Sequence, residues 1–231
     1  MTLKALKVLR KADVVVYDRL VMKILLKLTP AKAEKIYAGK RSGKHPMPQE
    51  KICAILTQRA RSGKVVVRLK GGDPFLFGRG AEEALEMKRA GIQFEIVPGI
   101  TSALAVPAYA GIPLTHRDYA SSVAIVTGHE DPAKVKNRVK WEKLASSVDT
   151  LIVLMGVKKL KAIVQGLIKG GRDPKTNIAI IEWGTTKRQR KTIGTLEDII
   201  KKANESRVKP PAVIVVGDVV SLEQELSWFK R

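Results

Sequence analysis

The chain has 231 residues, 45% of them hydrophobic, which is enough for one large domain or two smaller ones with a buried core. No apolar run approaches the roughly 20 residues of a membrane span, the Lys–Leu alternation of the N-terminus is unlike a signal peptide, and the lone Cys53 excludes a disulfide framework and a cysteine-based metal site. The formal net charge of +21 is compatible with a nucleic-acid partner, a polyanionic small substrate or a lysine-rich solvated surface.

The first half of the sequence alternates helix and strand signals, as an α/β protein does. The expected elements are, in order, a helix over 3–11 capped by Thr2, strands at 12–17 and 34–38, a helix over 48–61, a strand at 65–69, a helix over 81–90, a strand at 94–97, and a helix over 101–110 that Pro107 must bend or end. A parallel α/β unit normally starts on a strand. The opening helix therefore indicates either a lobe that lacks its first strand or a reading frame that starts upstream.

The second half repeats the scheme. Strands are expected at 122–127, 150–154, 177–181 and 212–216, with helices over 157–169 and 196–204. The strands are runs of Val, Ile and Leu without polar alternation, which indicates burial on both faces, as in mostly parallel sheets. A polar, turn-rich segment at 111–118 marks the boundary, so we predict lobes at 1–112 and 113–231. The expected fold is two α/β lobes with mostly parallel sheets and an active-site cleft between them.

Most of the predicted strands end in glycine, and ligands of open α/β sheets sit beyond the carboxyl ends of the strands. The six positions are Gly71, Gly99, Gly128, Gly156, Gly184 and Gly217. Each alone is explained by an ordinary turn, but their repetition predicts that they line one cleft. The densest stretch is 65–80, where a strand runs into two glycines, then Asp73, then a second glycine turn that opens a helix. Its bare backbone would admit a ligand, and Asp73 would face that ligand.

Several common signatures are missing from the sequence. No GxGxxG follows a strand, and there is no Walker A loop and no GxSxG nucleophile elbow. The three histidines lack metal-ligand spacing, so we expect no metal site. Aromatic residues make up 5% and do not interleave with basic ones, and the positive charge is spread over the chain. Both observations disfavour nucleic acid as a partner.

Six segments together carry a resemblance to a known family. They are Tyr17–Val21, Gly39–Gly43, Arg68–Gly80, Val97–Thr101, Ile112–Tyr119 and Val126–His129. As a set, and over essentially the whole chain, they resemble the uroporphyrinogen-III C-methyltransferases, a branch of the tetrapyrrole methylase family that uses S-adenosylmethionine. The chain departs from this family in one respect. The family has a strand and a glycine–proline loop before the helix that Thr2 caps here, and this chain lacks both.

The resemblance implies a two-lobe enzyme that methylates uroporphyrinogen III at C2 and C7 and gives precorrin-2, which leads to sirohaem and cobalamin. It implies S-adenosylhomocysteine as the second product and no metal. It also implies a homodimer in the cytoplasm, without a membrane partner. The alternative is a related methylase that acts on a later precorrin, or on a protein residue as in diphthine synthesis.

The resemblance also assigns two catalytic residues. Asp18 would be the proton acceptor and Lys40 the proton donor. From the residues alone, Asp18 fits a cleft-facing carboxylate at the end of a strand. It fits equally a cap or a partner of Arg19. Lys40 could be one more solvated lysine, although the basic loop at 39–45 suits a substrate that carries many carboxylates.

The cofactor-binding set is likewise implied by resemblance. It comprises Gly71, Gly72, Asp73, Leu76, Thr101, Ser102, Met155 and Gly184. The residue types are suitable, because glycines admit close backbone approach and Asp73 can accept hydrogen bonds from an amine or a ribose. Thr101 and Ser102 would open a helix whose N–H groups bind polar atoms. Met155 suits either packing against adenine or filling the core.

Overall fold

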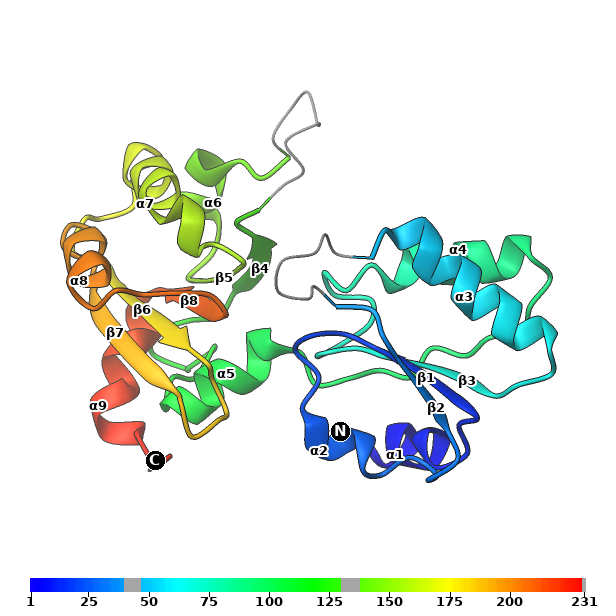
Figure 1. Cartoon of the computed structure of the whole chain (residues 1–231). Coiled ribbons are helices and arrows are strands. Elements are labelled where there is room, and N and C mark those ends of the chain that lie inside the picture. The colour runs from blue at the N-terminus through cyan, green and yellow to red at the C-terminus, as the bar shows by residue number, and fades with distance from the viewer. Residues whose placement is uncertain (40–46, 130–137, 230–231) are drawn as a thin grey trace. The chain divides into compact units, whose positions relative to one another are not determined.

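The computed structural model describes residues 1–39, 47–129 and 138–229, and the chain folds into two compact units, Met1–Thr101 and Ser102–Arg231 (Figure 1). The unit boundary lies earlier than the predicted division after residue 112. Helix α5 (Ser102–Ala110) accounts for the difference, because it packs against strands of the second unit. Among the residues that the structure describes, no helix is long and apolar enough to cross a lipid bilayer.

The first unit is a parallel three-stranded sheet with helices on both faces. Its strands are β1 (Val14–Tyr17), β2 (Glu34–Tyr37) and β3 (Val66–Leu69), in the order β2-β1-β3, and its helices are α1 (Leu3–Leu9), α2 (Lys23–Leu26), α3 (Gln49–Arg61) and α4 (Gly80–Arg89). The cap predicted at Thr2 is confirmed, since its hydroxyl accepts a hydrogen bond from the N–H of Ala5 at 3.2 Å.

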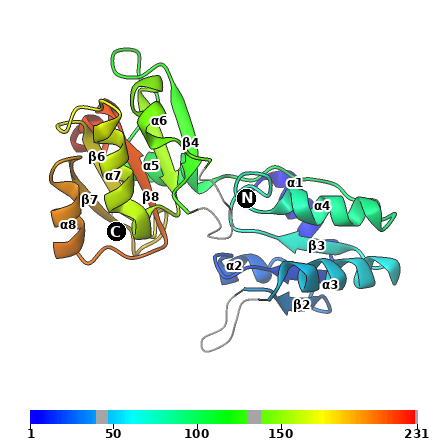
Figure 2. The same cartoon turned by 90° about the horizontal axis from the view of Figure 1, so that it is seen from above.

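The core of the first unit follows from the period of two along β1. Val14 and Val16 pack against the apolar sides of α3 and α4. Val15 points the other way, into a cluster with Leu9 of α1. Figure 1 shows α3 and α4 on one side of this sheet and α1 and α2 on the other, and Figure 2 looks down from the α3–α4 side. With both faces covered, the strand is apolar throughout, as its sequence predicted.

The strand predicted at 94–97 is wrong, because residues 92–100 form no regular structure. Their composition favours a strand, but a strand needs a neighbour to take its backbone hydrogen bonds. Within the described residues β3 pairs only with β1, and its other edge carries no strand. The segment is instead tied to α1 by an ion pair between Glu95 and Lys4.

The second unit holds a mixed five-stranded sheet in the order β4-β5-β8-β6-β7. Its elements are α5, β4 (Val123–Thr127), α6 (Trp141–Ser147), β5 (Thr150–Leu154), η1 (Val157–Lys159), α7 (Leu160–Lys169), β6 (Asn177–Glu182), β7 (Arg190–Thr195), α8 (Ile199–Glu205), β8 (Ala212–Val216), η2 (Asp218–Leu222) and α9 (Glu223–Leu226). The sequence analysis did not predict α6, β7, η2 or α9, nor α2 in the first unit. Helix α5 continues past Pro107 to Ala110, so Pro107 lies within the helix and does not end it.

The prediction of mostly parallel sheets is correct for the first unit and wrong for the second. Among the neighbouring strand pairs of the described sheet, β4–β5 is parallel, whereas β5–β8, β8–β6 and β6–β7 are antiparallel. The apolar runs correctly indicated burial on both faces, since every residue of β5 is buried. Burial does not depend on the direction of the neighbouring strand, so the sequence pattern could not supply that direction.

Strand direction also decides which glycine-ended loops share an edge. Because β8 is antiparallel to both β5 and β6, those two strands point the same way, as does β4. Gly128, Gly156 and Gly184 therefore lie at one edge of the second sheet. Gly217 follows the reversed strand β8 and lies at the opposite edge, where its N–H donates to the carbonyl of Asn177 at the start of β6. The prediction that Gly217 lines the same site is wrong.

Candidate active site

The loop after β3 is held in a tight, self-contacting shape by its glycines. A Cβ atom at Gly80 would lie 2.4 Å from the carbonyl oxygen of Pro74, and one at Gly78 would lie 2.7 Å from the same atom. The two residues that flank Gly78, Phe77 and Arg79, adopt positive φ angles of 51° and 58°. Strained backbone of this kind persists where the surroundings fix it, and it clusters at ligand sites.

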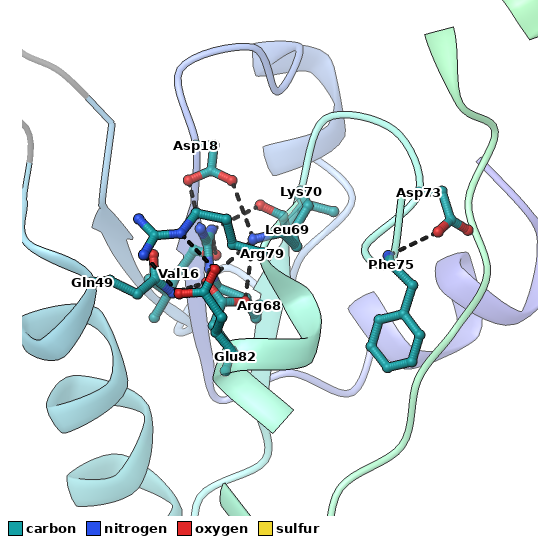
Figure 3. Close-up of polar contacts among 11 residues, drawn as sticks. Val16, Asp18, Gln49, Arg68, Leu69, Lys70, Asp73, Phe75, Arg79 and Glu82 are labelled. Carbon is teal, nitrogen blue, oxygen red and sulfur yellow. Dashed lines mark hydrogen bonds and ion pairs between the residues drawn. The ribbon is translucent and has the colours of Figure 1, made fainter. Parts of the chain in front are cut away.

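Asp73 fastens this loop to a second one. Its Oδ1 accepts hydrogen bonds from the N–H groups of Phe75 and Leu76 at 2.8 and 3.1 Å, and its Oδ2 accepts one from Gly99 at 2.9 Å. The Gly99 hydrogen bond is the largest cause of a lowered Asp73 pKa, opposed by partial burial and reinforced by the other two bonds. Figure 3 shows the hydrogen bond between Asp73 and Phe75. The sequence predicted a carboxylate facing a ligand and missed the role of Asp73 in linking the two loops.

Replacing Asp73 with Asn should reduce the acid sensitivity of the protein. Because the folded-state pKa is lowered, ionised Asp73 stabilises the fold above its unfolded pKa of about 3.9, and this contribution is lost as the pH falls through the lowered pKa. We expect Asp73→Asn to lower the unfolding free energy at pH 7 by about 1–3 kcal/mol. The unfolding free energies at pH 7 and at pH 3 should therefore differ less in this variant than in wild type. Urea unfolding at both pH values measures this.

A matched control for this prediction is Asp173→Asn. The Asp173 carboxylate accepts a hydrogen bond from the N–H of Lys175 in an exposed turn. Its replacement should change the pH 7 stability by less than about 1 kcal/mol. Equal effects of the two substitutions would contradict the bracing role of Asp73.

Gly99 packs directly on the Gly71–Gly72 turn. A Cβ atom at Gly99 would lie 2.1 Å from the carbonyl oxygen of Gly72. We expect Gly99→Ala to push the two loops apart and to weaken S-adenosylhomocysteine binding at least tenfold, which corresponds to about 1.4 kcal/mol. The control is Gly63→Ala, where a Cβ atom would meet nothing within 4 Å and only the positive φ of 72° is penalised. Isothermal titration should show unchanged binding for the control, and unchanged binding for Gly99→Ala would refute the expectation.

A buried charge cluster lies at the carboxyl ends of β1 and β3, and we call it the Arg68 cluster: Arg68, Lys70, Asp18, Glu83 and Gln49 (Figure 3). Arg68 bonds the Asp18 Oδ1 at 2.6 Å and the Glu83 Oε1 at 3.0 Å. Lys70 lies 3.2 Å from both oxygens of Glu83 and 3.9 Å from the Asp18 Oδ2. Gln49 donates a further hydrogen bond to Glu83 at 2.9 Å.

The electrostatics of the Arg68 cluster follow from burial and charge pairing. Desolvation is the largest cause of a lowered Lys70 pKa, and the neighbouring guanidinium of Arg68 lowers it further, while Glu83 and Asp18 act against both. The cluster holds two cations and two anions, so its formal charge is balanced. Of the four charged side chains, Asp18 is the most exposed, at 31%.

The sequence singled out Asp18 but not Arg68, Lys70 or Glu83. A signal was present, since Arg68 lies on the half-buried strand β3 and Lys70 directly follows that strand, two residues further on, so both side chains lie on its α4-facing side. Glu83 lies on the buried side of α4, four residues before Met87. Buried charges at such positions require partners of opposite charge. The cations Arg68 and Lys70 and the anion Glu83 supply these partners to one another.

The remaining predicted site residues of the first unit are distributed as follows. Gly71 is exposed, and a Cβ atom there would lie 3.2 Å from the Cβ of Leu20, which places the turn beside the loop that follows Asp18. Leu76 is half-buried in the strained loop. Thr101 is buried and ends the first unit. Lys40 lies outside the described residues.

In the second unit, Ser102 is the exposed first residue of α5. Met155 and Gly184 lie at one edge of the sheet, after β5 and β6. Met155 has a φ of 57° and is 51% exposed, which favours ligand contact over core filling. Gly184 packs on α5, since a Cβ atom there would lie 2.4 Å from a methyl carbon of Val106.

Two α/β units with strained or glycine-bearing loops at the carboxyl ends of their strands define a class of enzyme that binds small molecules there. Comparison with known proteins identifies the family. The sequence profile described as Tetrapyrrole (Corrin/Porphyrin) Methylases matches residues 1–200, and this chain belongs to that family.

Individual relatives are similar over nearly the whole chain. The S-adenosyl-L-methionine-dependent uroporphyrinogen III methyltransferase of Methanosarcina barkeri is 53% identical over 98% of this chain and 89% of its own length. The uroporphyrinogen-III C-methyltransferase of Methanocaldococcus jannaschii is 52% identical over 96% of this chain and 91% of its own length.

Solved structures agree with these relatives. The uroporphyrin-III C-methyl transferase of Thermus thermophilus, crystallised with S-adenyl homocysteine, has a TM-score of 0.80 at 39% identity and covers 96% of this chain and 93% of its own. The cobalt precorrin-4 methyltransferase CbiF has a TM-score of 0.82 at 29% identity and covers 95% of this chain and 90% of its own. The tetrapyrrole methylase fold predicted from the sequence is thus confirmed.

Proposed function

We propose that this chain transfers methyl groups from S-adenosylmethionine to uroporphyrinogen III, at C2 and then C7 or in the reverse order, to give precorrin-2 for sirohaem and cobalamin synthesis. The observation that carries the proposal is the 53% identity to the Methanosarcina barkeri uroporphyrinogen III methyltransferase over 98% of the chain. The net charge of +21 supports a polyanionic substrate, because a positive field attracts and steers carboxylates.

For the cofactor, we propose the residue set that the resemblance implies. The residues fit an adenosyl group with a charged amino acid tail. Gly71 exposes bare backbone, and Met155 offers a half-exposed polarisable side chain. When bound, S-adenosylmethionine supplies an electrophilic methyl group on a sulfonium. The chain's own task is to hold the nucleophilic substrate carbon in line with that methyl, about 3–3.5 Å away, and to exclude water.

For proton transfer, we propose Asp18 as the acceptor and Lys40 as the donor. Methylation of a ring carbon leaves the macrocycle with a proton to lose, which requires a base. Asp18 lies at the carboxyl end of β1, and its carboxylate is ion-paired and partly exposed, so it is available to receive that proton.

Two experiments test the assignment. Isothermal titration with S-adenosylhomocysteine should give one site per chain, and folded protein without binding would contradict the proposal. Mass spectrometry of the product should then show two methyl additions to uroporphyrinogen III. Methylation of a later precorrin or of a protein residue instead would favour the related methylases.

We also propose a cytoplasmic homodimer. The family resemblance and the single buried Cys53, which suits a reducing compartment, support this. Light scattering coupled to gel filtration should give twice the chain mass of 25.4 kDa. A monomer at micromolar concentration would contradict the dimer without affecting the proposed chemistry.

A further inference from the structure

We propose that Arg68 is a positioning residue for proton transfer: it fixes the Asp18 carboxylate through Oδ1 and leaves Oδ2 as the oxygen that receives the proton. This inference rests on the proposed function, in which Asp18 is the proton acceptor. It adds the group that controls Asp18 and the atom at which the proton arrives.

The contacts of the Arg68 guanidinium leave it little freedom. Its Nη2 donates to Asp18 at 2.6 Å, its Nε to Glu83 at 3.0 Å, and its Nη1 to the carbonyls of Val16 and Leu69 at 3.3 Å each. Bonds to two carboxylates and two strand carbonyls fix the plane of the fork. A planar fork that is fixed in this way can hold a carboxylate in one orientation, which a lysine cannot do.

The charged side chains of the Arg68 cluster differ in how far they are exposed to solvent. The exposed fractions of the side chains are 7% for Glu83, 8% for Lys70, 12% for Arg68 and 31% for Asp18. Glu83 is therefore the buried anchor, the two cations lie between, and Asp18 is the accessible end. A substrate approaching the cluster from solvent would meet Asp18 first.

The two oxygens of Asp18 are not equivalent. Oδ1 is occupied by Arg68, whereas among the described residues the ion-pair contact of Oδ2 is with Lys70, at 3.9 Å, which is beyond hydrogen-bond distance. Within the described residues, Arg68 and Lys70 are the cations within ion-pair distance of Asp18, and Glu83 lies behind them. In the proton transfer, the macrocycle loses a proton to Oδ2, Asp18 becomes a neutral acid, and the proton later passes to water.

The test compares Arg68→Met with wild type and with Arg59→Met. Arg59, in the same unit, also donates two hydrogen bonds to one carboxylate, that of Glu34, at 2.8 Å each. Glu34 is the first residue of β2 and so lies at the amino end of that strand. We expect Arg68→Met to lower kcat by about 10–100-fold while KM for S-adenosylmethionine stays within about threefold. Arg59→Met should change neither quantity.

Arg68→Lys separates charge from geometry and replaces Arg68→Met if that variant does not fold. It keeps a cation near Asp18, and we expect kcat to stay about 5–10-fold below wild type, because one ammonium cannot bridge both carboxylates in a plane. Wild-type kcat in folded Arg68→Met, or wild-type kcat in Arg68→Lys, would overturn the inference. S-adenosylhomocysteine titration of wild type distinguishes this from failure of the proposed function, in which wild type itself would neither bind nor methylate and the inference would fall with it.

Discussion

Asp18→Asn should lower kcat for uroporphyrinogen III methylation by about two to four orders of magnitude, because an amide keeps the shape of the side chain but cannot accept the proton. S-adenosylhomocysteine should still bind with wild-type affinity, since Asp18 is not in the proposed cofactor set. Single-turnover methylation, followed by mass spectrometry, measures the chemical step directly. The methylated product is expected to form slowly but with the same two additions.

The control for this prediction is an aspartate without a place in the site. Asp173 lies in an exposed turn of the second unit, where it accepts a hydrogen bond from Lys175. Asp173→Asn should leave kcat unchanged. If Asp18→Asn retained wild-type kcat, proton transfer would have to occur elsewhere, and both the role of Asp18 and the inference on Arg68 would be refuted.

Glu83→Ala should destabilise the first unit by about 3–5 kcal/mol, because it removes the buried anion that faces two buried cations. Arg68 and Lys70 would then share only the partly exposed Asp18. The effect should be confined to residues of the first unit. Hydrogen exchange with peptide-level resolution should show faster exchange in Met1–Thr101 than in wild type.

Two features of the chain make this prediction specific. Glu86→Ala, three residues further along α4, breaks an exposed ion pair with Arg89 and should lower the unfolding free energy by less than about 1 kcal/mol. The three tryptophans, Trp141, Trp183 and Trp228, all belong to the second unit, so tryptophan fluorescence reports on that unit alone. Equal stability of Glu83→Ala and Glu86→Ala would show that the Arg68 cluster does not hold the first unit together.

Local patterns predicted most of the elements correctly. The apolar run that became β1 and the capped helix after Thr2 are set by neighbouring residues and by burial, and both are found as predicted. The strand predicted at 94–97 failed because a ladder partner is a property of the sheet and not of the segment. The same reason explains why β7, a polar strand with an exposed Arg190 at its start, was missed.

The sequence likewise predicted only part of the candidate site. Residue types and the family resemblance pointed to the Gly71–Gly72 turn, to Asp73 and to Asp18. They did not show that Asp73 accepts three backbone hydrogen bonds, or that Asp18 is the exposed end of a buried ion network. Those facts depend on distances between segments that are distant in the sequence.

The sequence by itself determined where the chain is apolar enough to form strands, where glycine permits a tight turn, and which family the chain resembles, because each of these is encoded in adjacent residues. Only the tertiary structure decided strand direction, and with it the exclusion of Gly217 from the edge that holds Met155 and Gly184. Only the tertiary structure brought Arg68 of β3 and Lys70 directly after it against Glu83 of α4 and Asp18, which follows β1. Charges interact according to their separation and burial, and neither quantity exists until the chain has folded.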